Sequence, residues 1–179
     1  IDISNFETSE VDNLGSMFEN CYNLKSIDLS KFNTKKVIST MNMFRGCSSL
    51  TSLDLSNFET SSLQKISNMF QSCASLISID LSNFDTSYIT DTSFLFDGCK
   101  KLQKINLKNW DTKGIISMNS MFQGCESLSS IDLSSFKTTS LTDMTRMFAN
   151  CSSLQEIKAN NYFDTSRVLS ISQLFQGFK

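Results

Sequence analysis

The sequence contains no histidine and no proline among its 179 residues. The absence of histidine removes Ser-His and Cys-His nucleophile pairs, and it removes the commonest transition-metal ligand among side chains. No glycine-rich phosphate loop is present either. We therefore expect a protein that is not an enzyme and that holds no cofactor and no metal.

Long apolar runs and a strong charge imbalance are also missing. No run approaches the about 20 apolar residues that a membrane helix needs, and no basic start followed by an apolar segment marks a signal peptide. The 16 basic and 18 acidic residues leave a formal charge of −2, so we expect no nucleic-acid partner. The apolar share of 40 % is typical of a folded domain with a sizeable core.

The sequence does have an internal repeat of 26 residues. Its columns align without gaps until the seventh repeat, where one extra residue enters near Asn160 or Asn161. A fixed period of this length predicts one solenoid domain over 1–179, in which each repeat is one coil. The predicted repeats are 1–26, 27–52, 53–78, 79–104, 105–130, 131–156 and 157–179.

Each repeat contains the elements of one coil. "LTSLDL" (50–55) has strand periodicity, because Leu53 and Leu55 are two residues apart. Met144, Met147, Phe148 and Cys151 follow the spacing of one helix face, and Gly or Asn usually stands next. We predict an α/β solenoid of the leucine-rich-repeat kind: a right-handed coil with a short parallel sheet on its concave face and short α or 3₁₀ turns opposite.

The repeat resembles a known family. "LDLSNFETS" (53–61) with "NMFQSCASL" (68–76) is similar to the BspA-type leucine-rich repeat of bacterial surface proteins. "MFRGCSSL" (43–50) and "MFQGCESL" (121–128) match the mycoplasma-type subgroup. The resemblance implies a secreted or cell-surface protein, in some members a lipoprotein, that binds host components, cells or matrix proteins. Lys158, Ala159 and Phe178 depart from the pattern.

Two columns of the repeat predict structural ladders in the core. A phenylalanine recurs in every repeat, and a cysteine recurs in the first six. Cysteine side chains in one column point the same way, which disfavours disulfides, and no C-x-x-C is present for zinc. We expect buried, reduced cysteines. The ladders are Phe18, Phe44, Phe70, Phe96, Phe122, Phe148 and Phe175, and Cys21, Cys47, Cys73, Cys99, Cys125 and Cys151.

Polar residues between the inward leucines predict an exposed stripe. Aspartate recurs in this column, although like charges side by side in a sheet are unfavourable. Either each carboxylate is held by neighbouring serines and the corner backbone, or the stripe binds a ligand, and repeat five interrupts it with two lysines. The candidate ligand-binding residues are Asp28, Asp54, Asp80, Asp132, Lys104, Asn106, Lys108 and Trp110.

Trp110 and a column of threonines each have two competing interpretations. Trp110 is the sole tryptophan and lies beside the lysines, where it would suit an interface, but it also replaces a core phenylalanine. Threonine forms an unbroken column at Thr8, Thr34, Thr60, Thr86, Thr112, Thr138 and Thr165. Stacked threonines can match an ice lattice, but their position two residues after a core aromatic favours hydrogen bonds within the stack.

These observations give three hypotheses for function. The first is a binding or adhesion module on a bacterial surface, with a protein or glycan ligand. The second is a structural spacer or filament-forming repeat without a specific ligand, and an enzyme is the third and weakest. Because neither end of the repeat array carries a visible cap, we expect an excerpt of a longer chain, with any membrane anchor outside it, or end-to-end stacking of copies.

Overall fold

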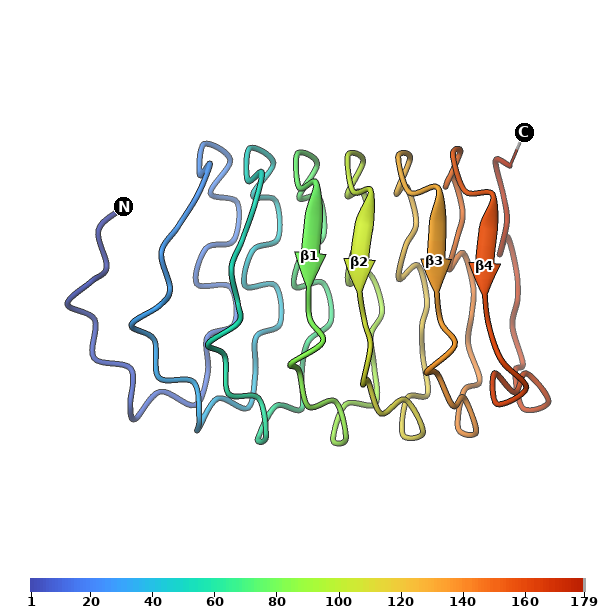
Figure 1. Ribbon diagram of the computed structural model, residues 1–179, viewed down its shortest axis with the longest axis horizontal. Coiled ribbons are helices and arrows are strands. Elements are labelled where there is room, and N and C mark those ends of the chain that lie inside the picture. Colours follow the sequence, from blue (N-terminus) through green and yellow to red (C-terminus); the bar gives the residue numbers. More distant parts are fainter. Residues whose placement is uncertain (179) are drawn as a thin grey trace.

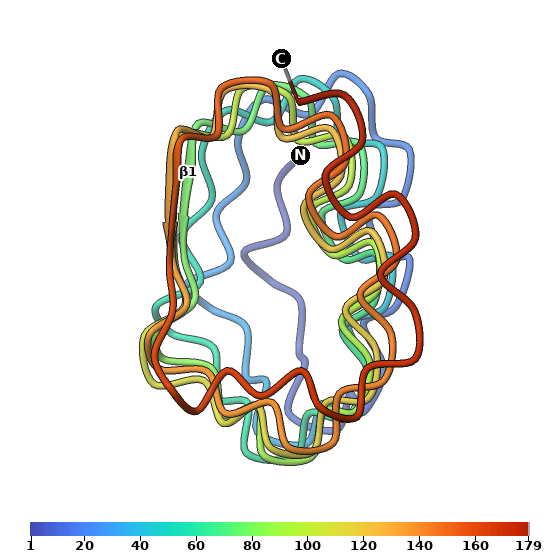
Figure 2. The ribbon, with the colours of Figure 1, turned by 90° about the vertical axis from the view of Figure 1, so that its right-hand side faces the viewer.

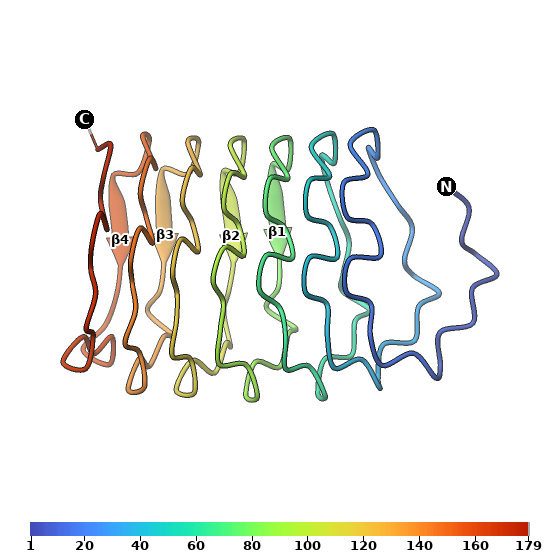
Figure 3. The ribbon, with the colours of Figure 1, turned by 180° about the vertical axis from the view of Figure 1, so that it is seen from behind.

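The computed structural model describes residues 1–178, which wind into a stack of coils along one axis (Figure 1). Each 26-residue repeat forms one coil, because residues 26 apart pair in parallel from coil to coil. In Figure 1 the strands descend on the near side while the stack advances toward the C-terminus, and in Figure 3 they lie on the far side. The coil is therefore right-handed, and the predicted solenoid is confirmed.

One wall of the solenoid carries all the strands of the described chain. They are β1 (Ser78–Asp80), β2 (Lys104–Asn106), β3 (Ser130–Asp132) and β4 (Glu156–Lys158). β1 pairs in parallel with β2, and β3 with β4. The central isoleucine of each strand points into the core and its two neighbours point outward. We call this outward surface, with its equivalents in the earlier coils, the strand face.

In the end-on view of Figure 2 the strand side of the first coils lies inward of β1 and the later coils, so the strand face is not the concave surface that we expected. Each strand has only three residues because a corner follows at once. The carboxylate of Asp80 accepts a hydrogen bond from the backbone N–H of Ser82 at 2.9 Å, which turns the chain away from the sheet.

The wall opposite the strands consists of turns, and the predicted helical segments are wrong: residues 1–178 contain no helix. We call residues 13–21 and their copies in other coils the turn wall, seen edge-on opposite β1 in Figure 2. Alternate N–H groups here point along the stack. Phe44 N–H donates to Met69 O of the next coil at 2.9 Å, whereas Arg45 N–H donates to Asn42 O at 3.0 Å. Bonds to the next coil replace the i→i−4 bonds of a helix.

The left-handed backbone conformation explains why a helix cannot form in the turn wall. Two turn-wall positions per coil have positive φ, for example Asn42 (60°) and Gly46 (74°) in the second coil. L-residues in this conformation interrupt a right-handed helix. The predicted left-handed stop after the apolar residues is present even at Ser72, where φ is 62°, but it follows a turn.

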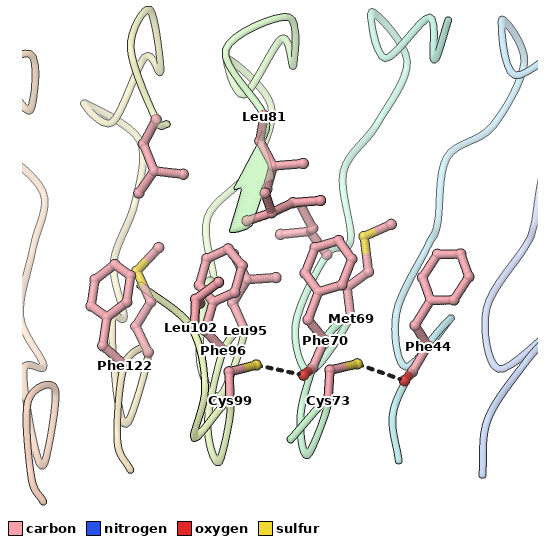
Figure 4. Close-up of a cluster of buried hydrophobic side chains, with 14 of the residues drawn as sticks. Phe44, Met69, Phe70, Cys73, Leu81, Leu95, Phe96, Cys99, Leu102 and Phe122 are labelled. Atoms are coloured by element: carbon pink, nitrogen blue, oxygen red, sulfur yellow. Dashed lines mark hydrogen bonds between the residues drawn. The ribbon is translucent and has the colours of Figure 1, made fainter. Parts of the chain in front are cut away.

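Aromatic and aliphatic side chains from every coil fill the space between the two walls. Phe44 and Phe70 stack with ring centroids 6.0 Å apart and parallel planes, and Phe70 and Phe96 continue the stack at 5.5 Å (Figure 4). Offset parallel rings at such distances are favourable. Because each ring meets its own copy above and below, the register between coils is fixed by side-chain shape.

Threonine hydroxyls join the coils at the corner that follows the strands. Thr34 is buried; its Oγ1 donates to Glu59 O at 3.0 Å and accepts from Glu59 N–H at 2.8 Å. Thr112 bonds to Lys137 in the same way, at 3.0 and 2.7 Å. These hydroxyls are satisfied inside the stack, so the geometry argues against an ice-binding surface at this column.

Candidate functional site

The strand face displays the aspartate stripe predicted from the sequence. Asp28, Asp54, Asp80 and Asp132 are exposed, one in each of four coils. Each accepts a backbone N–H from the serine two residues later, at 2.9 Å in every case. Hydrogen bonds from the side chain and the backbone N–H of this serine lower the pKa of each carboxyl below its ordinary value. One oxygen of each aspartate is thus committed to the corner, as the structural interpretation predicts.

Coil five changes the character of this face. Asn106 stands where coils one to four and coil six have aspartate; its Oδ1 accepts Lys108 N–H at 3.2 Å, and its amide donates to Asp80 Oδ2 at 3.1 Å. The corner is therefore kept while a negative charge is removed. Lys104 pairs in register with Ser78 of β1 and is exposed.

Lys104 and Lys108, the two lysines of this part of the strand face, make no ion pair within residues 1–178. Lys108 lines a hollow of about 410 Å³ between coils five and six, together with Asn106, Asp132, Ser134 and Ser135. The structure thus brings together three of the predicted site residues, Asn106, Lys108 and Asp132. Asp28 and Asp54 lie farther along the stack and do not line this hollow.

Trp110 belongs to the core and not to the binding surface. Its side chain is 2 % exposed, it stacks on Phe136 with a centroid distance of 6.3 Å, and its Nε1–H donates to Leu81 O at 2.9 Å. A ring held in this way has no free face or polar edge for a ligand. The structure therefore removes Trp110 from the candidate site, because it replaces a core phenylalanine.

A second group of exposed side chains lies at the corner next to coil five and was not predicted. Lys113, Lys137 and Tyr162 come from three successive coils. The Lys137 ammonium lies 5.5 Å from the centre of the Tyr162 ring. Two features of the sequence could have indicated them. Lys137 is a lysine at a repeat position where the other coils have an acidic residue or asparagine, and Tyr162 lies beside the inserted residue.

The cysteines form a single file without disulfides. All six are free; five are buried, and Cys21 is half-buried. The Sγ of Cys73 lies 3.2 Å from Phe44 O, and that of Cys99 lies 3.1 Å from Phe70 O, in each case in the preceding coil (Figure 4). Cysteine here is a hydrogen-bond donor as well as a small apolar side chain.

Burial also makes these thiols poor nucleophiles and poor metal ligands. Burial raises the pKa of Cys47 to about 11 and that of Cys151 to about 12, and the thiolate is the reactive species. No group of cysteines and carboxylates within residues 1–178 is arranged to hold a metal ion. The same residues include no helix that is long and apolar enough to span a bilayer.

Comparison with solved structures identifies the same architecture. A leucine-rich cell surface protein from Faecalibacterium prausnitzii matches with a TM-score of 0.57 at 20 % identity, over 79 % of this chain and 34 % of that one. A leucine-rich repeat protein from Bacteroides ovatus matches with a TM-score of 0.52 at 19 % identity, over 94 % and 46 %. At these identities the likeness shows the fold. The chain spans less than half of either structure.

Comparison with protein families covers the whole repeat array. One family model matches residues 1–79 and again 73–179, and curated proteins gave no match. The two matches together confirm the mycoplasma-type, BspA-like repeat inferred from the M-F-x-G-C-x-x-L phrase. The chain belongs to the family described as "Mycoplasma protein of unknown function, DUF285".

Proposed function

We propose that this chain is a non-enzymatic module of a bacterial cell-surface protein, and that it binds a protein or glycan ligand through the strand face. The observation that carries the proposal is the irregularity of coil five. Lys104 and Lys108 are exposed and make no ion pair within residues 1–178, on a wall where coils one to four and coil six present aspartate. Unpaired cations beside carboxylates can steer and orient a ligand of complementary charge.

The surface location rests on the family resemblance and on one solved relative. The Faecalibacterium prausnitzii protein is described as a leucine-rich cell surface protein. Protease treatment of intact cells that produce the full-length protein would test this location. Loss of the repeat array from intact cells supports it, and protection until the cells are lysed contradicts it.

The binding role is tested with purified chain and a panel of immobilised matrix proteins and glycans. The double variant K104Q/K108Q should lose binding to whichever panel member the wild type captures. K31Q/K65Q, which removes the same charge at two exposed sites away from coil five, should keep it. Unchanged binding by K104Q/K108Q would remove the strand face of coil five from the proposed function.

A structural spacer is the second candidate, and the uniform contacts between coils favour it. The same stacking of phenylalanines and the same threonine hydroxyl bonds recur along the chain. Such regularity suits a rigid rod that separates other parts of a protein. End-to-end association of copies belongs to this proposal. A wild-type chain that captures nothing from the panel, but lengthens into filaments in solution, would favour the spacer.

A further inference from the structure

Three surface hollows adjoin one another across coils five to seven. The first is the strand-face hollow lined by Lys108 and Ser135, and these two residues also line a second hollow of about 360 Å³ at the corner. Lys113 and Lys137 line both the second hollow and a third of about 430 Å³. We call the second and third hollows the corner track. Their shared lining residues make the track continuous.

The inserted residue of coil seven shapes the far end of the track. Asp132 pairs with Lys158 at the usual spacing of 26, but Phe163 follows Phe136 by 27, so the extra residue lies between Lys158 and Phe163. Tyr162 N–H donates to Asn160 Oδ1 at 2.7 Å, and the Tyr162 ring is 64 % exposed. The insertion thus places an exposed aromatic ring at this corner.

The charges along the track favour an anion. Lys108, Lys113 and Lys137 line it, and none of them makes an ion pair within residues 1–178. Two carboxylates also line it, and both are engaged by their own loops: Asp111 accepts Lys113 N–H at 3.2 Å and Asp164 accepts Ser166 N–H at 2.8 Å. Three ammonium groups therefore line the track together with two carboxylates, each of which already accepts one backbone hydrogen bond.

We propose that the corner track binds an acidic oligosaccharide, a chain of sugar rings that carry carboxylates. This inference rests on the proposed binding function and names its ligand class. The exposed Tyr162 ring offers an apolar face to a sugar ring, and Lys113 and Lys137 supply charge-assisted hydrogen bonds to its carboxylate. Thr139 and Asn161, which line the third hollow, offer polar groups to sugar hydroxyls.

The shape of the track favours a saccharide over a folded protein. The hollows are small, open to solvent and lined mainly by polar side chains, whereas protein interfaces concentrate affinity in buried aromatic pockets. Exposed ion pairs contribute little individually, so we expect weak binding at one track. Repeated sugars on a polymer, or several tracks on a cell surface, would raise the apparent affinity.

The test uses immobilised polygalacturonate as the probe, with fully methyl-esterified polygalacturonate as its uncharged counterpart. The wild-type chain should bind the acid and not the ester, and binding should fall as salt is added. K113Q/K137Q should weaken binding about tenfold, because two charge pairs are lost. Y162A should weaken it as well.

The matched controls keep the same change at distant positions. K31Q/K65Q removes two exposed lysines outside the track, and Y22A removes an exposed tyrosine on another part of the surface; both should bind as the wild type does. Thermal unfolding of every variant excludes loss of fold as the cause. Equal binding of acid and ester, or unchanged binding by K113Q/K137Q, would overturn the proposal.

The outcome also separates this inference from the proposed function. Suppose that the wild-type chain does not bind polygalacturonate but binds a panel ligand, and that K104Q/K108Q loses this binding. This result overturns the corner track and supports the proposed binding function. A chain that captures neither overturns both. Binding of polygalacturonate that depends on Lys113, Lys137 and Tyr162 supports the corner track, and its loss in K104Q/K108Q as well would support the strand face.

Discussion

The thiol of Cys99 donates a hydrogen bond to the main-chain oxygen of Phe70, 29 residues earlier, with an Sγ–O distance of 3.1 Å. The same carbonyl accepts Cys73 N–H at 3.1 Å. Each cysteine therefore ties its coil to the preceding one through a backbone atom. This relationship explains why a small polar-edged side chain occupies a slot in an otherwise apolar core.

Substitution of Cys99 should reveal this hydrogen bond. We expect Cys99→Ser to be more stable than Cys99→Ala by about 1 kcal/mol, because serine keeps a donor facing Phe70 O while alanine loses it. Denaturant titration measures both free energies of unfolding. If alanine is as stable as serine, the thiol contributes only as an apolar filler.

Thiol reactivity should follow burial along the file of cysteines. At pH 8 iodoacetamide should modify Cys21, which is half-buried, well before the five buried cysteines. Mass spectrometry of the native chain should show one rapid modification, and the denatured chain should show six. Fast labelling of Cys73 or Cys99 in the native chain would mean that the coils open readily.

The same burial predicts a loss of stability at high pH. Burial raises the pKa of Cys47 from an ordinary value of 9.0 to about 11, and that of Cys151 to about 12. A thiol whose pKa is higher in the folded state stabilises the fold below the unfolded pKa, and that stability is lost as the pH rises through the folded pKa. The unfolding temperature should therefore fall above pH 9. Replacing Cys47 and Cys151 with serine should flatten this dependence.

The aspartate stripe offers a test of the corner hydrogen bond. Asp54→Asn should keep the bond to Ser56 N–H, as Asn106 does in coil five with Lys108 N–H. We expect a small loss of unfolding temperature at pH 7, because the neutral amide keeps the bond but loses the ionised carboxylate that the serine bonds favour. Asp54→Ala should lower the unfolding temperature further, since the bond is lost. Equal unfolding temperatures for the two variants would contradict this role.

The stripe also contributes to the pH dependence on the acid side. Hydrogen bonds to Ser30 and Ser56 lower the pKa of Asp28 and Asp54 in the folded state. Their contribution is present above the unfolded pKa of 3.8 and disappears as the pH falls through the folded pKa. The acid limb of the stability curve should therefore shrink in an Asp28→Asn, Asp54→Asn variant.

The left-handed column of the turn wall predicts opposite effects at two equivalent positions. Ser72 has φ of 62° and Gly98 has φ of 73°. Ser72→Gly should stabilise the chain and Gly98→Ala should destabilise it, each by about 1 kcal/mol, because only glycine adopts this conformation without steric cost. A Cβ at Gly98 would meet its nearest neighbours at 3.6 Å, so crowding does not explain the expected loss. Thermal and denaturant unfolding measure both changes.

The arrangement of coils could be predicted from the sequence, whereas the conformation of the turn wall could not. The 26-residue columns fixed which residues meet, including the stack of Phe44 on Phe70. Met144, Met147, Phe148 and Cys151 have helical spacing, but successive turns of about three residues give the same spacing. The hydrogen bonds that replace those of a helix, such as Phe148 N–H to Leu174 O, join different coils. The local sequence therefore does not distinguish the two conformations.

The candidate site was predictable only where the alternation of residues along a strand determines whether a side chain points outward or into the core. Lys104 and Asn106 flank an inward isoleucine, so their exposure follows from the period of two. Trp110 is buried, as its core column indicates, although its proximity in sequence to two lysines also made it a candidate ligand-binding residue. Lys113, Lys137 and Tyr162 lie in corners, and only the fold shows that they meet.

Amide chemical-shift mapping tests the central claim most directly, which is that binding is confined to the irregular coils five to seven. The uniformly ¹⁵N-labelled chain would be titrated with a short galacturonate oligomer, and the shifts of each coil would be followed. Binding at the corner track should give concentration-dependent shifts at Lys108, Lys113, Lys137 and Tyr162, with the equivalent corners of coils one to four unchanged. Shifts distributed evenly over all coils, or none at the corner track, would contradict the claim.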